Sequence, residues 1–148
     1  MQPTRILPDL QCSLLCEEVR QEANGNFFLI GVLNYIRVPQ VPVTAFKLTV
    51  FNRWTAGVGE FTEQVRLIAP DQVTVLRKSE MKFVLQGAGL HATNVTVFGQ
   101  VEFATAGIYF VELMVDDIMK LRYPLSIMVA PQKAAGGEPA GPPKPPVE

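Results

Sequence analysis

The chain has 148 residues, of which 48% are apolar and 18% charged, and its formal net charge is −1. This composition is typical of one globular domain with a buried core, and it lacks the basic surface that nucleic-acid binding requires. No apolar segment at the start resembles a secretory signal, and no run approaches the roughly 18 apolar residues that span a bilayer. We therefore expect a cytoplasmic protein that binds neither nucleic acid nor a membrane.

The segment 10–23 allows two interpretations. Its spacing of leucines and polar residues suits a helix that ends at Gly25, but it also suits a strand. Asn24-Gly25 is a strong β-hairpin signal, and a hairpin needs a strand on each side of its turn. We therefore expect a strand before Asn24 and a two-residue turn that places Val19 opposite Ile30.

From 27 to 38, apolar residues occupy both even-numbered and odd-numbered positions, which lie on opposite faces of a strand. This pattern predicts one strand that is covered on both faces. Further strands are predicted by alternation or by short apolar runs between turn signals, at 46–51, 60–68, 73–76, 82–85 and 95–103. In the last of these, the stripe of Val95, Val97, Val101 and Phe103 is expected to face inward, with Gly99 as a candidate bulge.

The final part of the chain has the clearest pattern. Apolar side chains alternate over residues 109–115 and again over 119–129, which predicts two antiparallel strands with one buried face. Matching the two stripes sets Leu113 opposite Leu121. A two-residue turn would break this match, so a loop of at least residues 116–118 is predicted.

Together these elements predict an all-β chain. We expect an immunoglobulin-like antiparallel β-sandwich of about seven to nine strands over residues 1–130. Residues 131–148 hold six of the twelve prolines and three of the eleven glycines, a composition too poor in apolar residues to fold. We expect a flexible, disordered proline-rich tail there, and a ligand for a proline-binding groove is the functional alternative.

T-A-G-I-Y at residues 105–109 resembles the entry to the penultimate strand of immunoglobulin-like sandwiches. In those domains a tyrosine hydroxyl hydrogen-bonds back to the preceding chain and forms a tyrosine corner. Thr105 stands where aspartate is usual, and Val111 stands where antibody domains have their second cysteine. The resemblance therefore implies the broad sandwich class and not an antibody domain.

A longer resemblance covers residues 16–42, C-E-E-V-R-Q-E-A-N-G-N-F-F-L-I-G-V-L-N-Y-I-R-V-P-Q-V-P. This segment is similar to the opening of a family of small bacterial all-β proteins of unknown function. In that family a strand, a glycine turn, a second strand and a proline crossover follow one another, and a G-x-Y-x-F/V hairpin comes last. The resemblance implies the fold and a bacterial origin, and it implies no activity, cofactor or catalytic residue.

No catalytic or metal-binding constellation stands out in the sequence. His91 is the single histidine, and together with Cys12 and Cys16 it supplies too few ligands for a zinc site. The two cysteines are expected to be buried or half-buried thiols. No serine lies in a nucleophile-elbow context, and a Cys–His pair would depend on the fold. We expect no enzyme activity and no cofactor.

Four residues near the ends of predicted strands or loops form a candidate ligand edge: Tyr35, Arg53, Trp54 and His91. Exposed tyrosine and tryptophan rings could stack on a small ligand such as a carbohydrate, and Tyr, Trp and Arg dominate binding interfaces. The competing interpretation places Trp54 in the core, where it covers the end of the sandwich.

Apolar residues also fall on the predicted outer side of the final hairpin and its neighbour. The candidate interaction surface consists of Phe98, Phe110, Met114 and Met128. The register of the hairpin sets Glu112 against Arg122 on the same side, as a cross-strand ion pair. So apolar an outer face favours a protein partner or self-association. We expect a non-catalytic protein-binding or assembly module, with a small-ligand or carbohydrate-binding sandwich as the alternative.

Overall fold

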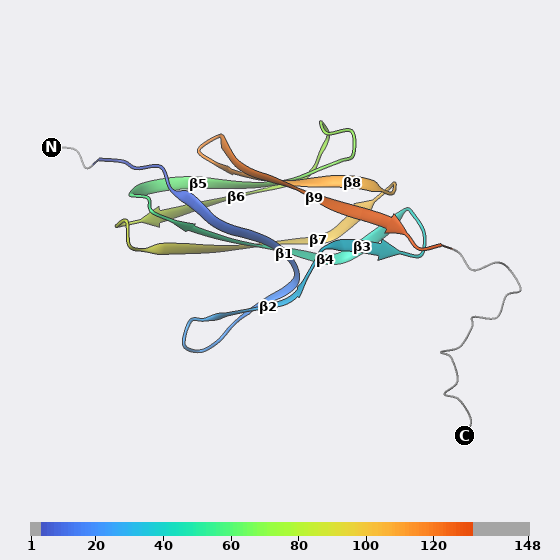
Figure 1. Cartoon of the computed structure of the whole chain (residues 1–148), viewed down its shortest axis with the longest axis horizontal. Helices are drawn as coiled ribbons and strands as arrows, with labels where there is room; N and C mark the ends of the chain where they lie inside the picture. Colours follow the sequence, from blue (N-terminus) through green and yellow to red (C-terminus); the bar gives the residue numbers. More distant parts are fainter. Residues whose placement is uncertain (1–3, 132–148) are drawn as a thin grey trace, which may run out of the picture.

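A computed structural model describes residues 4–131, which form nine β-strands and no helix (Figure 1). The strands are β1 (Asp9–Gln21), β2 (Phe27–Val32), β3 (Tyr35–Val38), β4 (Val43–Thr55), β5 (Gly59–Ile68), β6 (Val75–Leu85), β7 (His91–Phe103), β8 (Gly107–Val115) and β9 (Ile118–Val129). The all-β prediction is confirmed. Apart from Pro131, the predicted tail at 131–148 lies outside the described residues. No helix that could cross a membrane occurs within residues 4–131.

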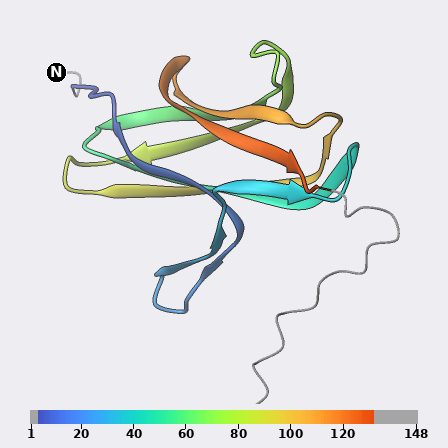
Figure 2. The ribbon, with the colours of Figure 1, turned by 45° about the vertical axis from the view of Figure 1, so that its right-hand side comes forward.

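The strands form two sheets that lie face to face, as two views of the ribbon show (Figures 1 and 2). One sheet has the order β2-β1-β4-β7 and the other the order β3-β9-β8-β5-β6. The core fills the space between them, with Val50 and Phe103 from the first sheet and Leu113 and Ile127 from the second. One pairing departs from the predicted antiparallel pattern, because β3 runs parallel to β9. The chain crosses between the sheets before β3 instead of turning back within one sheet.

The register predicted for the last hairpin is confirmed, since Leu113 lies opposite Leu121. The predicted loop is wrong. The turn consists of Asp116 and Asp117 alone, both with positive φ (46° and 65°), which is the geometry of a tight hairpin turn. The register shifts between Leu113 and Met114, where Lys120 of β9 has no residue opposite it and forms a β-bulge. This extra residue compensates for the tight turn, so the two apolar stripes still face each other.

The first hairpin confirms the strand interpretation of residues 10–23. Its loop is longer than the predicted two-residue turn. The Gly25 N–H donates to the Glu22 carbonyl at 2.9 Å, and Gly25 itself has a φ of +94°. A turn that closes on a left-handed glycine forms a three-residue hairpin loop. The register therefore shifts, and Val19 faces Leu29, one residue away from its predicted partner.

The apolar stretch 27–38 was predicted as one covered strand, and this prediction is wrong. The stretch forms two strands in different sheets, β2 and β3. Gly31, near the end of β2, has a φ of +66°, and a Cβ there would lie 2.8 Å from the Glu17 side chain. The apolar residues at both parities therefore reflect an edge strand followed by a crossover, and not burial on two sides.

Strand β7 changes the face that it turns toward the core. Phe98, Val101 and Phe103 all belong to the core. In a regular strand, Phe98 would point to the opposite face from Val101 and Phe103. The change falls at Gly99 and Gln100, where Gln100 has a φ of +53°. The predicted inward valine stripe is therefore wrong in its first half, and Val97 is exposed.

Strand β4 changes face at the same place as β7. Leu48 and Val50 are core residues, whereas Val43 and Ala45, of the other parity, pack against the core nearer the start of the strand. Phe46 lies at the change and is exposed. The two strands keep one register throughout, so Gly99 is not a bulge that shifts the pairing.

The hairpin of β5 and β6 follows the predicted alternation on one strand only. Phe61, Val65 and Leu67 of β5 are buried as predicted. β6 is one continuous strand where two short ones, 73–76 and 82–85, were predicted. The middle of β6 reads R-K-S-E, and this polar stretch is tolerated because β6 lies at a sheet edge.

Candidate functional site

The structure separates the four residues of the candidate ligand edge. Trp54 is fully buried, and its ring stacks on Phe83 with centroids 5.6 Å apart. An exposed stacking role for Trp54 is therefore wrong, and the core interpretation is confirmed. Tyr35 lies on β3, in the other sheet. Arg53 and His91 do come together, because both line one pocket at the adjacent ends of β4 and β7.

The predicted interaction surface is only partly exposed. Phe98 is buried in the core, so its place on an outer face is wrong, and the cause is the change of face in β7. Phe110 and Met114 are half-buried, and the guanidinium of Arg122 lies 4.0 Å from the centre of the Phe110 ring. Met128 is the member of this set that is well exposed. These residues therefore do not make a continuous apolar patch.

The outer face of β8 instead has a buried carboxylate with two cationic neighbours. Glu112 pairs with Arg122 as predicted, with Oε2 to Nε at 3.8 Å. A closer partner was not predicted: the Arg66 Nη2 donates to Glu112 Oε1 at 2.6 Å. Because β5, β8 and β9 are neighbours in the sheet, their registers bring these three side chains together. The charge of Glu112 is thus balanced within the sheet.

A second buried carboxylate lies between the two sheets. Glu63 of β5 is 1% exposed and faces Trp54 and Asn52 of β4 and Asn94 of β7. The Trp54 Nε1 donates to Glu63 Oε2 at 2.5 Å, and the Asn94 Nδ2 donates to the same oxygen at 3.0 Å. Within residues 4–131 the other oxygen, Oε1, has no hydrogen-bond partner, and neither does the Asn52 amide.

The environment of Glu63 favours its neutral form. Desolvation by burial raises the pKa of this carboxyl, and the hydrogen bonds from Trp54 and Asn94 oppose that shift without cancelling it. A raised pKa in a cleft would suggest acid–base catalysis. Here the carboxyl is sealed from solvent, so no substrate reaches it in this conformation. We therefore expect Glu63 to affect the stability of the fold, and the size of this effect to depend on whether its carboxyl is protonated.

A two-stranded arm projects from the first sheet (Figure 1). We define the arm as residues 16–32, where β1 leaves β4 and pairs with β2. Figures 1 and 2 show this hairpin projecting from the sheets. It touches the body through Phe27, whose ring meets Phe51 edge-on with centroids 5.6 Å apart. Glu18 adds an ion pair with Lys47 at 3.3 Å.

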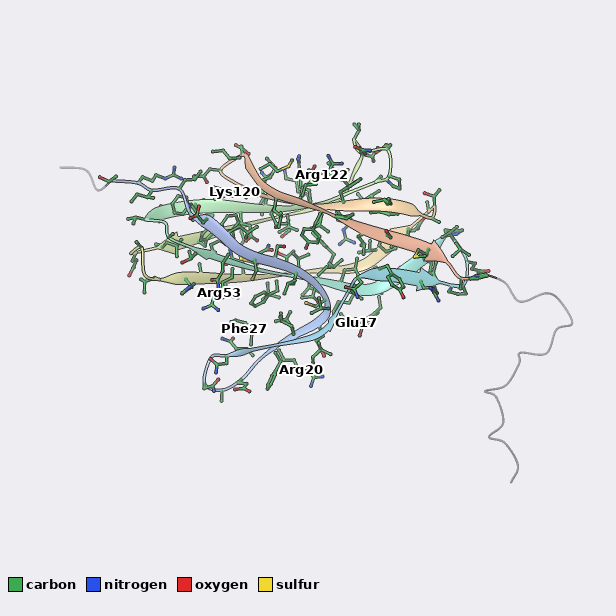
Figure 3. All side chains as sticks on the ribbon, in the orientation of Figure 1. Glu17, Arg20, Phe27, Arg53, Lys120 and Arg122 are labelled. Carbon is green, nitrogen blue, oxygen red and sulfur yellow. The ribbon has the colours of Figure 1, made fainter. Side chains whose placement is uncertain are left out.

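The outward face of the arm is apolar and open to solvent along β2, and charged along β1, where Arg20 and Glu18 lie opposite Phe28 and Ile30. Phe28, Ile30 and Val32 alternate along β2 and are 52%, 39% and 48% exposed. Arg20, opposite Phe28 on β1, points away from the sheets (Figure 3). β2 is also the first strand of its sheet, so its outer edge has no partner strand within the described residues.

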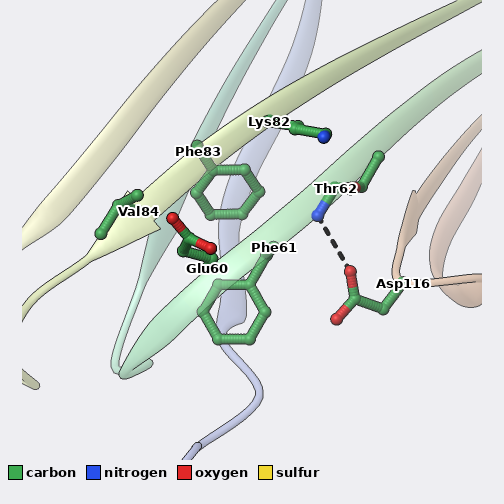
Figure 4. Close-up of a pocket in the computed structure, with 7 residues that line it drawn as sticks. All are labelled: Glu60, Phe61, Thr62, Lys82, Phe83, Val84 and Asp116. Carbon is green, nitrogen blue, oxygen red and sulfur yellow. Dashed lines mark hydrogen bonds between the residues drawn. The ribbon is translucent and has the colours of Figure 1, made fainter.

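A shallow hollow lies over β5 and β6, beside the last turn (Figure 4). It is lined by Glu60, Phe61, Thr62, Lys82, Phe83, Val84 and Asp116. Its Asp116 carboxylate is engaged within the fold, since the Thr62 N–H donates to Asp116 Oδ1 at 2.9 Å and Arg5 pairs with the other oxygen of that carboxylate. This carboxylate therefore links the last turn to β5 and to Arg5.

The cysteines and the histidine do not meet. Cys16 is buried and Cys12 half-buried, both as free thiols, and burial raises the pKa of Cys16. Cys12 lies on β1 and His91 on β7, with β4 between them, so two strand spacings of about 4.8 Å separate their backbones. Within residues 4–131 no group of three His, Cys, Asp or Glu residues is placed to hold a metal ion.

Comparison with known proteins identifies the family of this chain. A family model described as "Family of unknown function (DUF6941)" matches residues 11–128. The chain belongs to this family. No curated protein matches the chain. The DUF6941 match begins within β1 and ends within β9, so it includes the arm and both sheets.

Sequence reasoning missed the buried carboxylate of Glu63 in this DUF6941 protein, and it predicted Glu112 only as half of an ion pair with Arg122. Glu63 shares the parity of Phe61 and Val65, both of which were predicted to face inward, and that parity was the available signal. The exposed arm was missed for the opposite reason. Its apolar residues were read as buried, because hydrophobicity alone does not distinguish an edge that awaits a partner from a core strand.

Proposed function

We propose that this DUF6941 protein is a non-catalytic protein-binding or assembly module that engages its partner through β2. The observation that supports this most directly is the apolar edge of the arm, which has no partner strand among residues 4–131. Its strand reads F-F-L-I-G-V and contains no charged residue and no proline. Sheet edges of monomeric proteins are normally protected by such residues, because an open edge pairs with other chains.

The exposed side chains add specificity to such pairing. In β-strand addition the main chain supplies hydrogen bonds and alternate side chains select the partner. Phe28, Ile30 and Val32 point to one side and would be covered by the partner or by its neighbouring strand. Burial of these three large apolar side chains would drive association with the partner. It would also stabilise the arm, because a two-stranded hairpin is only marginally stable on its own.

We also propose that the fold is an immunoglobulin-like sandwich. In that arrangement strands A, B and E share one sheet and C, F and G share the other. β1, β4 and β7 share one sheet here, and β5, β8 and β9 share the other, in the same chain order. The Tyr109 hydroxyl also donates to the Thr105 carbonyl at 2.7 Å, the hydrogen bond of a tyrosine corner. The two free thiols support a reducing, cytoplasmic location.

The test is to change the edge without changing the fold. Ile30→Lys places a cation on the exposed side of β2, opposite Glu18, which already pairs with Arg20 and Lys47. The matched control is Val84→Lys, because Val84 is also about half exposed on an edge strand, β6. The two variants and the original chain are compared by light scattering and by capture of bound proteins from the native host.

We expect the original chain and Val84→Lys to show the same self-association or to capture the same partner. Ile30→Lys should lose that association while its circular dichroism spectrum stays unchanged. Equal association by all three proteins would refute the role of β2. Equal loss in both lysine variants would also refute it, because the effect would then be one of charge and not of the arm.

A further inference from the structure

The inner side of the arm encloses a pocket that the proposed function does not use. The pocket lies between the tip of the arm and the outer face of the β1-β4-β7 part of the sheet. Its main lining residues are Phe27, Leu29, Phe51, Arg53, His91 and Thr93. Figure 3 shows Arg53 on the sheet and Phe27 on the arm, with both side chains in the space between the two.

The strand registers explain why these residues meet. Arg53 of β4 lies directly opposite Thr93 of β7, and Phe51 follows two residues away on the same face. The arm then folds beneath this face, and its Phe27 ring contacts Phe51. One end of the pocket is therefore polar, with a guanidinium and a hydroxyl, and the other end is apolar.

Arg53 is the residue that indicates a ligand. Among residues 4–131 it takes part in no ion pair. Its Nε is buried and has no hydrogen-bond partner within the same residues. Because this N–H is closed to solvent, a ligand in the pocket would meet the two terminal nitrogens of Arg53, and a guanidinium is suited to hold a carboxylate through two parallel hydrogen bonds. Of the residues that the structure describes, none that lines the pocket is acidic, so none of these side chains competes for this role.

We propose that this pocket binds a carboxylate that is attached to an aromatic or branched apolar group. The carboxylate would meet Arg53 and the Thr93 hydroxyl, and the apolar group would lie against Phe27, Leu29 and Phe51. One arginine balances one negative charge, whereas a phosphate monoester has a charge near −2 at neutral pH and would be under-compensated. The same chemistry belongs to a free organic acid and to the last residue of a peptide.

The probe for this site is N-acetyl-phenylalanine, titrated into the full chain and followed by amide chemical shifts in NMR. We expect saturable shifts at Phe27, Leu29 and Thr93. The amide-capped analogue, which lacks the negative charge, should bind at least about tenfold more weakly, and so should N-acetyl-phenylalanine to the Arg53→Gln variant. Arg37→Gln is the matched control, since Arg37 also lies beside an aromatic ring, 5.6 Å from the centre of Tyr35, and should leave binding unchanged.

Two further comparisons complete the test. Phe27→Ala removes one apolar side of the pocket and should also weaken binding, which provides a second variant if Arg53→Gln disturbs the sheet. A tripeptide that ends in phenylalanine with a free carboxylate identifies the source: tighter binding than the single residue assigns the site to a chain end, and weaker binding assigns it to a free acid.

Several results would overturn the proposal. They are the absence of saturable shifts up to about 10 mM, beyond the weak millimolar range, equal binding of the acid and its amide, or unchanged binding by Arg53→Gln. The site uses the inward side chains of β2, Phe27 and Leu29, whereas the proposed partner surface uses the outward ones, such as Ile30. Ile30→Lys should therefore leave probe binding intact, so failure of one proposal does not decide the other.

Discussion

The buried carboxyl of Glu63 should make the stability of this protein depend on pH in a predictable direction. Burial raises the pKa of Glu63 in the folded state above its ordinary value of 4.5. The folded chain therefore holds this proton more tightly than the unfolded chain does. The resulting stabilisation is fully present below pH 4.5 and is lost as the pH rises through the raised pKa of the folded state.

The size of the effect follows from proton linkage. While the folded state retains the proton and the unfolded state has released it, each pH unit removes about 1.4 kcal/mol of unfolding free energy. For a chain of this length that corresponds to a fall in Tm of about 3–5 °C per pH unit. Glu63→Gln abolishes the titration and keeps an oxygen that accepts from Trp54 and Asn94. Its new amide N–H can donate to the unpaired Asn52 oxygen.

The assay is urea unfolding of the original chain and of Glu63→Gln across the pH range in which both remain folded. The difference in unfolding free energy between the two should grow in favour of Glu63→Gln as the pH rises from 4.5 and then level off. Glu60→Gln, which changes an exposed carboxyl three residues earlier, should keep the original pH dependence. Parallel curves for the original chain and Glu63→Gln, or a difference that shrinks with rising pH, would refute the reasoning.

Three other substitutions test single contacts by urea unfolding. Tyr109→Phe removes the hydrogen bond to the Thr105 carbonyl and should cost about 1 kcal/mol with an unchanged m-value. Glu112→Ala leaves the partly buried Arg66 without its carboxylate at 2.6 Å, and a loss of about 2–3 kcal/mol is expected. Gly25→Ala forces a side chain into a φ of +94° and should cost about 1 kcal/mol. A change of less than about 0.3 kcal/mol would contradict the contact in question.

The sequence was most informative where one face of a strand is buried along its whole length. Alternation over 109–115 and 119–129 defined the final register, and it did so even though the turn was predicted wrongly. A bulge can absorb a residue without moving the apolar stripe, so the stripe constrains the register more strongly than the turn does. At Gly25 no such stripe existed on β2, and the predicted register was wrong by one residue.

The candidate sites were harder to predict, because they depend on which residues face each other across sheets. The change of face at Gln100 moved Phe98 into the core, and a single left-handed residue gives little signal in a sequence. Trp54 and Arg53 are adjacent, so they point to opposite sides of β4 and could not both belong to one exposed edge. His91 joined Arg53 only through the pairing of β4 with β7.

The arm is held at both of its ends. Its first strand is the continuation of β1, which is paired to β4, and its second strand leads within two residues into β3, which is paired to β9. A hairpin tied to both sheets loses less freedom on binding than a tethered loop would, since its base is already ordered. A partner on β2 would therefore meet a prearranged strand. Any tension on that strand would be transmitted to the two sheets together.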